Sequence, residues 1–283
     1  AGCARLSAMP SSLPIDPPAA RSLTGVLPQL VASVSGRSDW FAPARSAIVI
    51  VADGLGRGNL AQRAAYARFL SERMAKRDAA RTVFPATTAA ALSSLFTGVL
   101  PGEHGIVGYR VRVPGTASAP NQLTGWEHDG LDPLSWQRSQ PVFEREVAGG
   151  RRCFVVSRAQ YAGTGFTTAT VRGAEFVAAS GIGERLAMAE ALAGTHDGSL
   201  VYVYIPELDV IGHAQGWESD RWSAELESLD AELRRWDRQL APGIGAVLTA
   251  DHGMIDVPAH RHVLLREGDP LLDEVEVIGG EPR

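Results

Sequence analysis

The sequence predicts an α/β fold: a mostly parallel central sheet flanked by helices, with a small cap insertion. Short runs of β-branched and apolar residues recur without alternation, as in strands buried on both faces of a parallel sheet. Helical sequence lies near each run. Polar residues follow three of the runs directly, where ligands of open α/β sheets bind.

Composition and charge are those of an ordinary globular protein. The 283 residues suffice for one large α/β domain or two small ones. Hydrophobic residues make up 45% of the chain and charged residues 21%, a composition that does not indicate a disordered or fibrous chain. A formal net charge of −5 provides no basic surface for a polyanion, so stable nucleic-acid binding is not expected. The two cysteines, Cys3 and Cys153, are not expected to form a stabilising disulfide.

Membrane and targeting signals are weak. The longest apolar stretches, such as Ala47 to Ala52, are far shorter than the roughly 20 residues of a membrane helix. The start lacks a charged region followed by an apolar one, and Met9 has the position of a natural initiator. We therefore predict a cytoplasmic protein that does not bind a membrane. The alternative is a lipoprotein, because Ala1-Gly2-Cys3 matches the end of a lipoprotein cleavage site.

The elements follow in order along the chain. Residues 1–45 are predicted to form an N-terminal arm, rich in Pro, Ser and Ala from residue 10, with a short helix around Leu23 to Val34. The main domain covers residues 46–283. Its strands are predicted at Ala47 to Ala52, Cys153 to Val156, Leu200 to Ile205 and Ala246 to Thr249.

Two further segments have a recognisable pattern. Residues of about 105–150 are rich in Gly, Pro and Trp, with a strand-like piece from Tyr109 to Val113, and are predicted to form the cap insertion over the sheet edge. A charged helix carries one apolar stripe for core packing, at spacings of four and three: Trp222, Leu226, Leu229, Leu233, Trp236 and Leu240.

Three strand ends carry candidate metal ligands. Asp53 follows the first strand, and taken alone it is better explained as a helix N-cap. Asp209 and His213 are four residues apart and share one face of a helical turn, whereas Asp251 and His252 are adjacent and need an irregular turn to reach one ion. Either Asp–His pair alone is compatible with a simple hydrogen bond. Together, carboxylate oxygen and imidazole nitrogen suit zinc, with manganese as the alternative.

A threonine pair is the candidate seat for an anion. Thr87 and Thr88 follow Pro85 and precede an Ala-rich helix. A hydroxyl at that position lies where free backbone N–H groups and the positive helix end favour a phosphate. Without the metal residues, an ordinary Thr N-cap would be the default interpretation.

These segments together resemble the type I phosphodiesterase and nucleotide pyrophosphatase family of the alkaline phosphatase superfamily. The order of the motifs is also the same, and they span residues 47 to 254. The resemblance implies an alkaline phosphatase-like catalytic domain over residues 46–283. It is carried by Asp53-Gly54, Phe84 to Gly98, Pro101 to Gly105, Asp209 to His213 and Asp251 to Met254.

The resemblance also implies roles for single residues. In that family the nucleophilic threonine precedes a Thr-Gly pair by a fixed interval, which selects Thr88 over Thr87 by counting back from Gly98. Two divalent metal ions are implied, zinc first and manganese as the alternative. One ion is assigned to Asp53, Thr88, Asp251 and His252, and the other to Asp209 and His213.

Two departures from the family pattern stand out. Nucleotide pyrophosphatases usually have an Asn that contacts phosphate five residues after the His of the His-Gly pair, where this chain has Tyr109 after His104. The second metal normally has another His, downstream of Asp251, where only His260 and His262 follow. We expect a C-terminal truncation, or else one of these two histidines as a substitute, although a solvated loop is favoured for both.

The implied activity is metal-dependent hydrolysis of a small-molecule phosphate ester through a phosphothreonine at Thr88. Phosphodiesters or nucleotide pyrophosphates are the first choice of substrate, with Trp126 and Tyr109 as candidates to stack on a ring or as buried packing. Alternatives in the superfamily are a phosphomonoesterase, a phosphonate hydrolase and a phosphomutase. A non-catalytic metal-binding relative is the alternative of another class, and the oligomeric state is not predicted.

Overall fold

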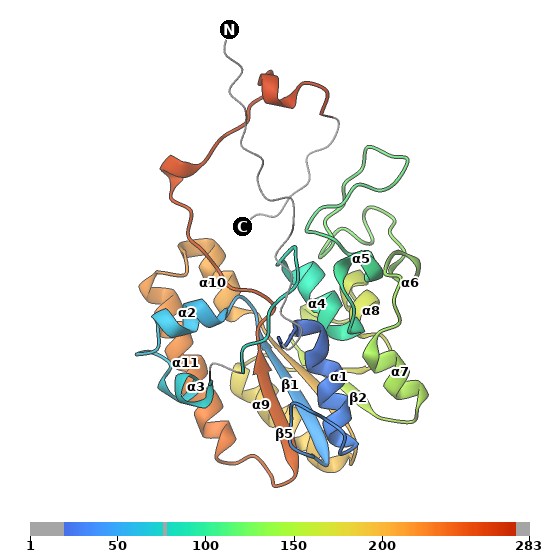
Figure 1. The fold of residues 1–283 in the computed structure, drawn as a ribbon, viewed down its shortest axis with the longest axis vertical. Coiled ribbons are helices and arrows are strands. Elements are labelled where there is room, and N and C mark those ends of the chain that lie inside the picture. The colour runs from blue at the N-terminus through green and yellow to red at the C-terminus, as the bar shows by residue number, and fades with distance from the viewer. Residues whose placement is uncertain (1–19, 76–77, 276–283) are drawn as a thin grey trace.

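The computed structural model describes residues 20–75 and 78–275. In this part of the chain five parallel strands form one sheet in the order β3-β2-β4-β1-β5 (Figure 1). The predicted α/β class with a parallel sheet is therefore confirmed. The strands are β1 (Ser46–Ala52), β2 (Cys153–Ser157), β3 (Glu175–Ala178), β4 (Leu200–Ile205) and β5 (Ile244–Thr249).

The strand β1, which lies between β4 and β5, separates two hydrophobic cores. All seven of its residues are buried, and their side chains alternate between two hydrophobic cores. Ile48, Ile50 and Ala52 pack in one core, and the residues between them pack in the other. An apolar run without alternation is therefore required here, because both faces of the strand are covered.

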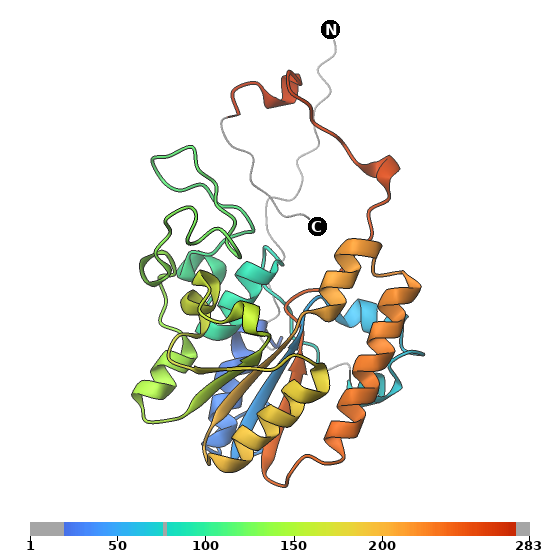
Figure 2. The ribbon, with the colours of Figure 1, turned by 180° about the vertical axis from the view of Figure 1, so that it is seen from behind.

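Helices cover both faces of the sheet. The helix α1 lies on one face and α9 on the other, as the two opposite views show (Figures 1 and 2). The helices are α1 (Leu23–Val34), α2 (Arg57–Gln62), α3 (Arg68–Arg73), α4 (Thr88–Thr97), α5 (Pro101–His104), α6 (Pro133–Trp136), α7 (Val142–Ala148), α8 (Gly165–Val171), α9 (Ile182–Thr195), α10 (Glu207–Gln215) and α11 (Asp220–Asp237).

The predicted stripe on α11 is confirmed as core packing. Its apolar residues from Trp222 to Trp236 are all buried in the core that contains Ile48 and Ile50. Leu240 follows the end of the helix at Asp237 and packs against the same core. The stripe therefore attaches α11 to the sheet and leaves the charged face to solvent.

The two segments outside the main sheet contribute to the core. The predicted helix from Leu23 to Val34 is present as α1, whose buried face packs on the sheet, while residues 1–19 lie outside the described residues. In the 105–150 segment, the strand-like piece forms only an isolated bridge between Arg110 and Asn121. The same segment includes α7, with Phe143 buried against the sheet. Within residues 20–75 and 78–275, every helix is too short or too polar to cross a bilayer.

Candidate active site and metal centre

The parallel register brings three acidic positions to one edge of the sheet. Ala52 of β1 lies beside Ile205 of β4, and Val51 lies beside Thr249 of β5, so the carboxyl ends of the three strands are level. The residues that follow each strand therefore meet above this edge. Asp53 follows β1, and Asp251 comes two residues after the end of β5.

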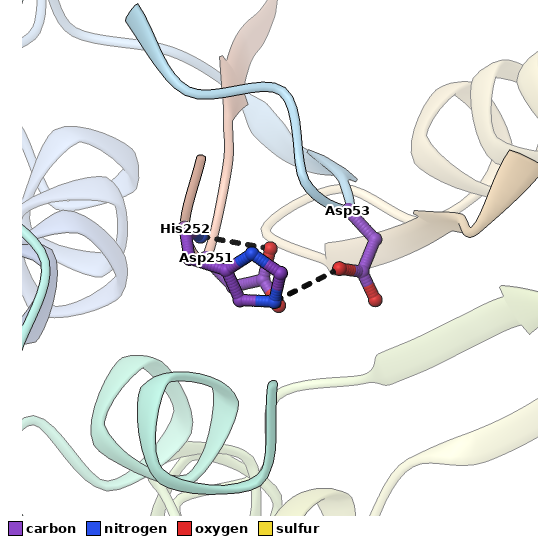
Figure 3. Close-up of side chains that lie close together, drawn as sticks. All are labelled: Asp53, Asp251 and His252. Atoms are coloured by element: carbon purple, nitrogen blue, oxygen red, sulfur yellow. Dashed lines mark hydrogen bonds and ion pairs between the residues drawn. The ribbon is translucent and has the colours of Figure 1, made fainter. Parts of the chain in front are cut away.

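Asp53, Asp251 and His252 form a compact buried cluster (Figure 3). One ligand atom of each residue lies within 4.8 Å of the others. The Nε2 atom of His252 is 3.4 Å from Oδ1 of Asp53 and 3.3 Å from Oδ2 of Asp251. The three side chains are almost wholly shielded from solvent. They are the right residue types, at the right spacing, to share one cation.

Hydrogen bonding in the cluster indicates which atoms face the centre. Nδ1 of His252 lies 3.1 Å from the carbonyl oxygen of Gly253, which can only accept, so we place the proton on Nδ1. The lone pair of Nε2 then faces the two carboxylates. Oδ1 of Asp53 and Oδ2 of Asp251 are buried and accept no hydrogen bond from the described residues. Two buried carboxylate oxygens without a donor, on either side of an imidazole nitrogen, fit a bound cation well.

The charge balance at Asp53 supports the same conclusion. Burial, followed by the negative charges of Asp251 and Asp209, raises the pKa of the Asp53 carboxyl well above its ordinary value. Tyr204 opposes this rise, because its hydroxyl donates a hydrogen bond to Oδ2 of Asp53. A divalent cation between the carboxylates would offset their repulsion.

The structure distinguishes the two neighbouring threonines. Thr87 is the N-cap of α4, and its side chain accepts a hydrogen bond from the backbone N–H of Ala90. Thr88 is the first residue of α4 and is buried, with its Oγ1 only 3.0 Å from Nε2 of His252. Thr87 therefore caps the helix, whereas the hydroxyl of Thr88 contacts His252 of the buried cluster.

The second Asp–His pair lies next to this cluster. Asp209 and His213 belong to α10, and their Oδ1 and Nε2 atoms are 3.6 Å apart. A Cβ atom added to Gly54 would be 3.3 Å from Oδ1 of Asp209, so this carboxylate borders the Asp53-Gly54 turn. The structure thus brings all six predicted site residues to one edge of the sheet.

The two later histidines lie elsewhere. His260 and His262 are exposed, in and next to a short 3-10 helix of the segment that extends away from the sheet (Figure 1). Nε2 of His262 hydrogen-bonds the carbonyl oxygen of Val257 at 2.9 Å. Within the described part of the chain, neither histidine belongs to a group of three possible metal ligands.

Sequence reasoning missed two residues that support the site. The hydroxyl of Tyr204, in β4, hydrogen-bonds Asp53. Because the rest of this strand is apolar, the sequence indicates only a packing role for Tyr204. Asn59 of α2 pairs with Met254 through both backbone groups, donating to the carbonyl at 2.8 Å and accepting from the N–H at 3.1 Å. The available signal in the sequence was an Asn directly after the Gly-rich segment that follows Asp53.

Two residues singled out from the sequence serve packing. Trp126 is buried in a small core, and its indole N–H donates to the carbonyl oxygen of Gln122 at 2.8 Å. His104 is buried, with Nε2 2.9 Å from the Ser94 hydroxyl, and burial lowers its pKa to about 4. His104 is therefore neutral near pH 7. It contacts α4, the helix that begins with Thr88.

A comparison with family models identifies the chain. The model of the type I phosphodiesterase / nucleotide pyrophosphatase family matches residues 47–276. The chain belongs to this family. The match begins within β1 and includes every candidate site residue, so the family relationship covers the whole of the site described above. The resemblance expected from the motifs is thereby confirmed, within the alkaline phosphatase superfamily.

Solved structures of relatives share the fold. Murine ectonucleotide pyrophosphatase / phosphodiesterase 5 in complex with AMP has a TM-score of 0.58 at 17% identity, over 76% of this chain and 59% of that one. Phosphonoacetate hydrolase from Sinorhizobium meliloti 1021 in complex with phosphonoformate has a TM-score of 0.51 at 22% identity. This match covers 74% of this chain and 57% of that one. The chain thus spans less than two thirds of the length of either.

A short stretch is related to a curated protein. Over 65 residues the chain is 40% identical to phosphopentomutase from Rhizobium meliloti (strain 1021). The matched stretch is 23% of this chain and 16% of that protein. At these identities and coverages, the solved structures show a common fold.

Proposed function

We propose that this chain is a metal-dependent hydrolase of phosphate esters, in which Thr88 is the nucleophile. The observation that carries the proposal is the 3.0 Å distance between the Thr88 hydroxyl and Nε2 of His252, at the edge of the buried Asp53–Asp251–His252 cluster. The relatives bound to AMP and phosphonoformate support a phosphate or phosphonate ligand. We assign the catalytic domain to residues 46–283, with 105–150 as its cap.

Two divalent cations, zinc first and manganese as the alternative, complete the proposed site. Bound there, they would lower the pKa of the threonine hydroxyl and neutralise charge on the phosphoryl oxygens. One would be held by Asp53, Thr88, Asp251 and His252, and the other by Asp209 and His213. Zinc accepts these oxygen and nitrogen ligands, and a cation would satisfy the buried carboxylate oxygens that lack donors.

The proposed reaction has two steps. Oγ1 of Thr88 attacks phosphorus, the P–O bond to one alcohol breaks, and that alcohol leaves with the proton lost by the threonine. Water then attacks the phosphothreonine, which restores the Thr88 hydroxyl and releases the phosphorylated product. Because Thr88 begins the ten-residue helix α4, the backbone N–H groups of its first turn favour the negative phosphoryl group.

The nucleophile is tested by substitution of the two neighbouring threonines. With zinc-loaded protein and bis(4-nitrophenyl) phosphate, Thr88→Ala should lower kcat by at least about 1000-fold, because no other hydroxyl replaces the nucleophile. Thr87→Ala is the matched control. It should cost about 1 kcal/mol of stability through loss of the helix cap but retain most turnover. Acid-quenched wild-type protein should carry a phosphoryl adduct on Thr88, detected by mass spectrometry; undiminished turnover by Thr88→Ala contradicts the proposal.

Other reactions of the superfamily remain as alternatives. The phosphonoacetate hydrolase fold and the phosphopentomutase segment favour testing phosphonates and sugar phosphates beside mono- and diesters. Phosphodiesters or nucleotide pyrophosphates remain the first choice. A panel that shows no turnover while the protein retains two metal ions per chain would support the non-catalytic metal-binding relative instead.

A further inference from the structure

The thioether of Met254 contacts both groups of proposed ligands. A Cβ atom added to Gly54 would be 3.1 Å from Sδ of Met254, and one added to Gly212 would be 2.4 Å from the same atom. Gly54 directly follows Asp53, and Gly212 directly precedes His213 in α10. The side chain of Met254 therefore packs against the turn of the first ligand group and against the helix of the second.

The backbone that carries this side chain is held from two directions. Asn59 of α2 donates to the carbonyl oxygen of Met254 at 2.8 Å and accepts from its N–H at 3.1 Å. Two residues later, Asp256 accepts from the backbone N–H groups of Trp217 and Glu218, at 3.1 and 3.2 Å, in the turn between α10 and α11. Because both ends of this short segment are attached, the side chain of Met254 has a defined place beside α10.

The size of Met254 limits how closely α10 approaches the turn after β1. A Cβ atom at Gly212 would also be 2.5 Å from Cε of Met254, whereas the next nearest atom, Cδ1 of Trp222, would be 3.6 Å away. The close contact at this position of the helix is thus with the methionine. The long unbranched side chain of methionine fills irregular gaps of this kind, and close packing transmits its volume to the neighbouring backbone.

We propose that Met254 is a positioning residue that sets the separation between the buried Asp53–Asp251–His252 cluster and the second Asp–His pair. The inference rests on the proposed function, in which these two groups hold the two cations. Met254 acts through the backbone of the turn and of α10, as residues that orient ligands do in other metal sites. A displaced α10 weakens mainly the second cation, because the cluster keeps hydrogen bonds of its own, such as that from Gly54 N–H to Oδ1 of Asp251 at 3.2 Å.

Calorimetric zinc titration of the full, metal-free chain tests the proposal. The weaker ion is assigned to the second Asp–His pair, which offers fewer ligands than the cluster. Met254→Ala should raise the Kd of the weaker ion about 10- to 100-fold and that of the tighter ion by less than about threefold. Met254→Leu, which conserves most of the volume, should keep both Kd values within about threefold of wild type.

A second truncated methionine separates positioning from general destabilisation. Met188 of α9 is also partly buried against the same core, away from the site, so Met188→Ala deletes the same atoms. It should lose similar stability in urea unfolding and bind both ions like wild type. Equal effects of Met254→Ala and Met188→Ala on the weaker ion would overturn the inference.

A methyl group on α10 tests whether the contact itself matters. Gly212→Ala places a Cβ atom 2.4 Å from Sδ of Met254, so it should displace the thioether or the helix and raise the Kd of the weaker ion about tenfold. In the Met254→Ala background the same methyl group has room, and the added effect should be less than about twofold. Additive effects of the two substitutions would refute the contact as the cause.

Failure of the proposed function gives a different result. Wild-type protein that binds fewer than two zinc ions contradicts that function, and metal-free crystals then decide the inference. In Met254→Ala the distance between the Cα atoms of Gly54 and Gly212 should differ from that in wild type by more than the coordinate error, and in Met188→Ala it should not. The same distance in all three proteins would refute the positioning role.

Discussion

At the scale of single residues, Tyr204 determines how Asp53 presents its carboxylate. The tyrosine hydroxyl donates to Oδ2, which leaves Oδ1 directed at Nε2 of His252, 3.4 Å away. This hydrogen bond also opposes the rise in the pKa of Asp53 that burial and neighbouring carboxylates cause. A partner that orients a ligand in this way contributes to metal affinity without touching the metal.

Removal of that hydroxyl should therefore weaken cation binding. We expect Tyr204→Phe to raise the Kd for zinc about 10- to 100-fold, because one carboxylate oxygen loses its buried donor and the other its fixed orientation. Titration calorimetry on the metal-free chain measures this directly. Tyr202→Phe deletes the same atom from the neighbouring tyrosine of β4 and should bind zinc like wild type; equal affinities in the two variants would refute the orienting role.

The acidic site residues were accessible from sequence, whereas their supports were not. Asp53 directly follows β1 and Asp251 comes two residues after β5, and neighbouring parallel strands bring such positions together. Tyr204 lies within an apolar strand, so only the three-dimensional contact with Asp53 reveals its role. Residue types alone did not separate Thr87 from Thr88, because the choice depends on where the helix begins.

At the scale of elements, helix α2 holds the turn that carries Asp251 and His252. Asn59 binds both backbone groups of Met254. The backbones also approach closely, since a Cβ atom on Gly56 would lie 2.5 Å from Cα of Gly253. The turn therefore depends on the absence of a side chain at Gly56.

Two glycines of this segment should respond oppositely to alanine. Gly56→Ala should destabilise the chain by about 1–3 kcal/mol, because the new methyl group collides with backbone that cannot move freely. Gly58→Ala, inside α2 with open space around it, should be neutral or stabilise by up to about 1 kcal/mol. Urea unfolding of both variants is the measurement. Equal stability losses would mean that the close approach does not constrain the turn.

The predicted elements were most accurate where burial dictates the pattern. The four strands predicted from apolar runs are all present. β1, β2 and β4 are buried on both faces, which requires such runs, whereas β5 is an edge strand with only Ile244 fully buried. The strand β3 was missed, since it has only four residues and none is fully buried. The strand β5 begins earlier than expected, at Ile244, because Gly245 interrupts the apolar run.

At the scale of the whole molecule, the site results from strand order and register. Neighbouring strands β4, β1 and β5 come from distant parts of the chain, and they end at the same level. The helix α4 adds the threonine from one face, and α10 adds the second Asp–His pair at the same edge. Chain segments more than 190 residues apart thus share one buried cluster, as the hydrogen bond from Gly54 N–H to Asp251 illustrates.

The central claim is that this edge of the sheet holds divalent cations beside Thr88. Anomalous diffraction, measured on either side of the zinc absorption edge from crystals grown with zinc, tests it most directly. We predict one peak within about 2.0–2.3 Å of ligand atoms of Asp53, Asp251 and His252 and in contact with the Thr88 hydroxyl, and another beside Asp209 and His213. Zinc located only at other positions, with none between Asp53 and Asp251, would contradict the claim.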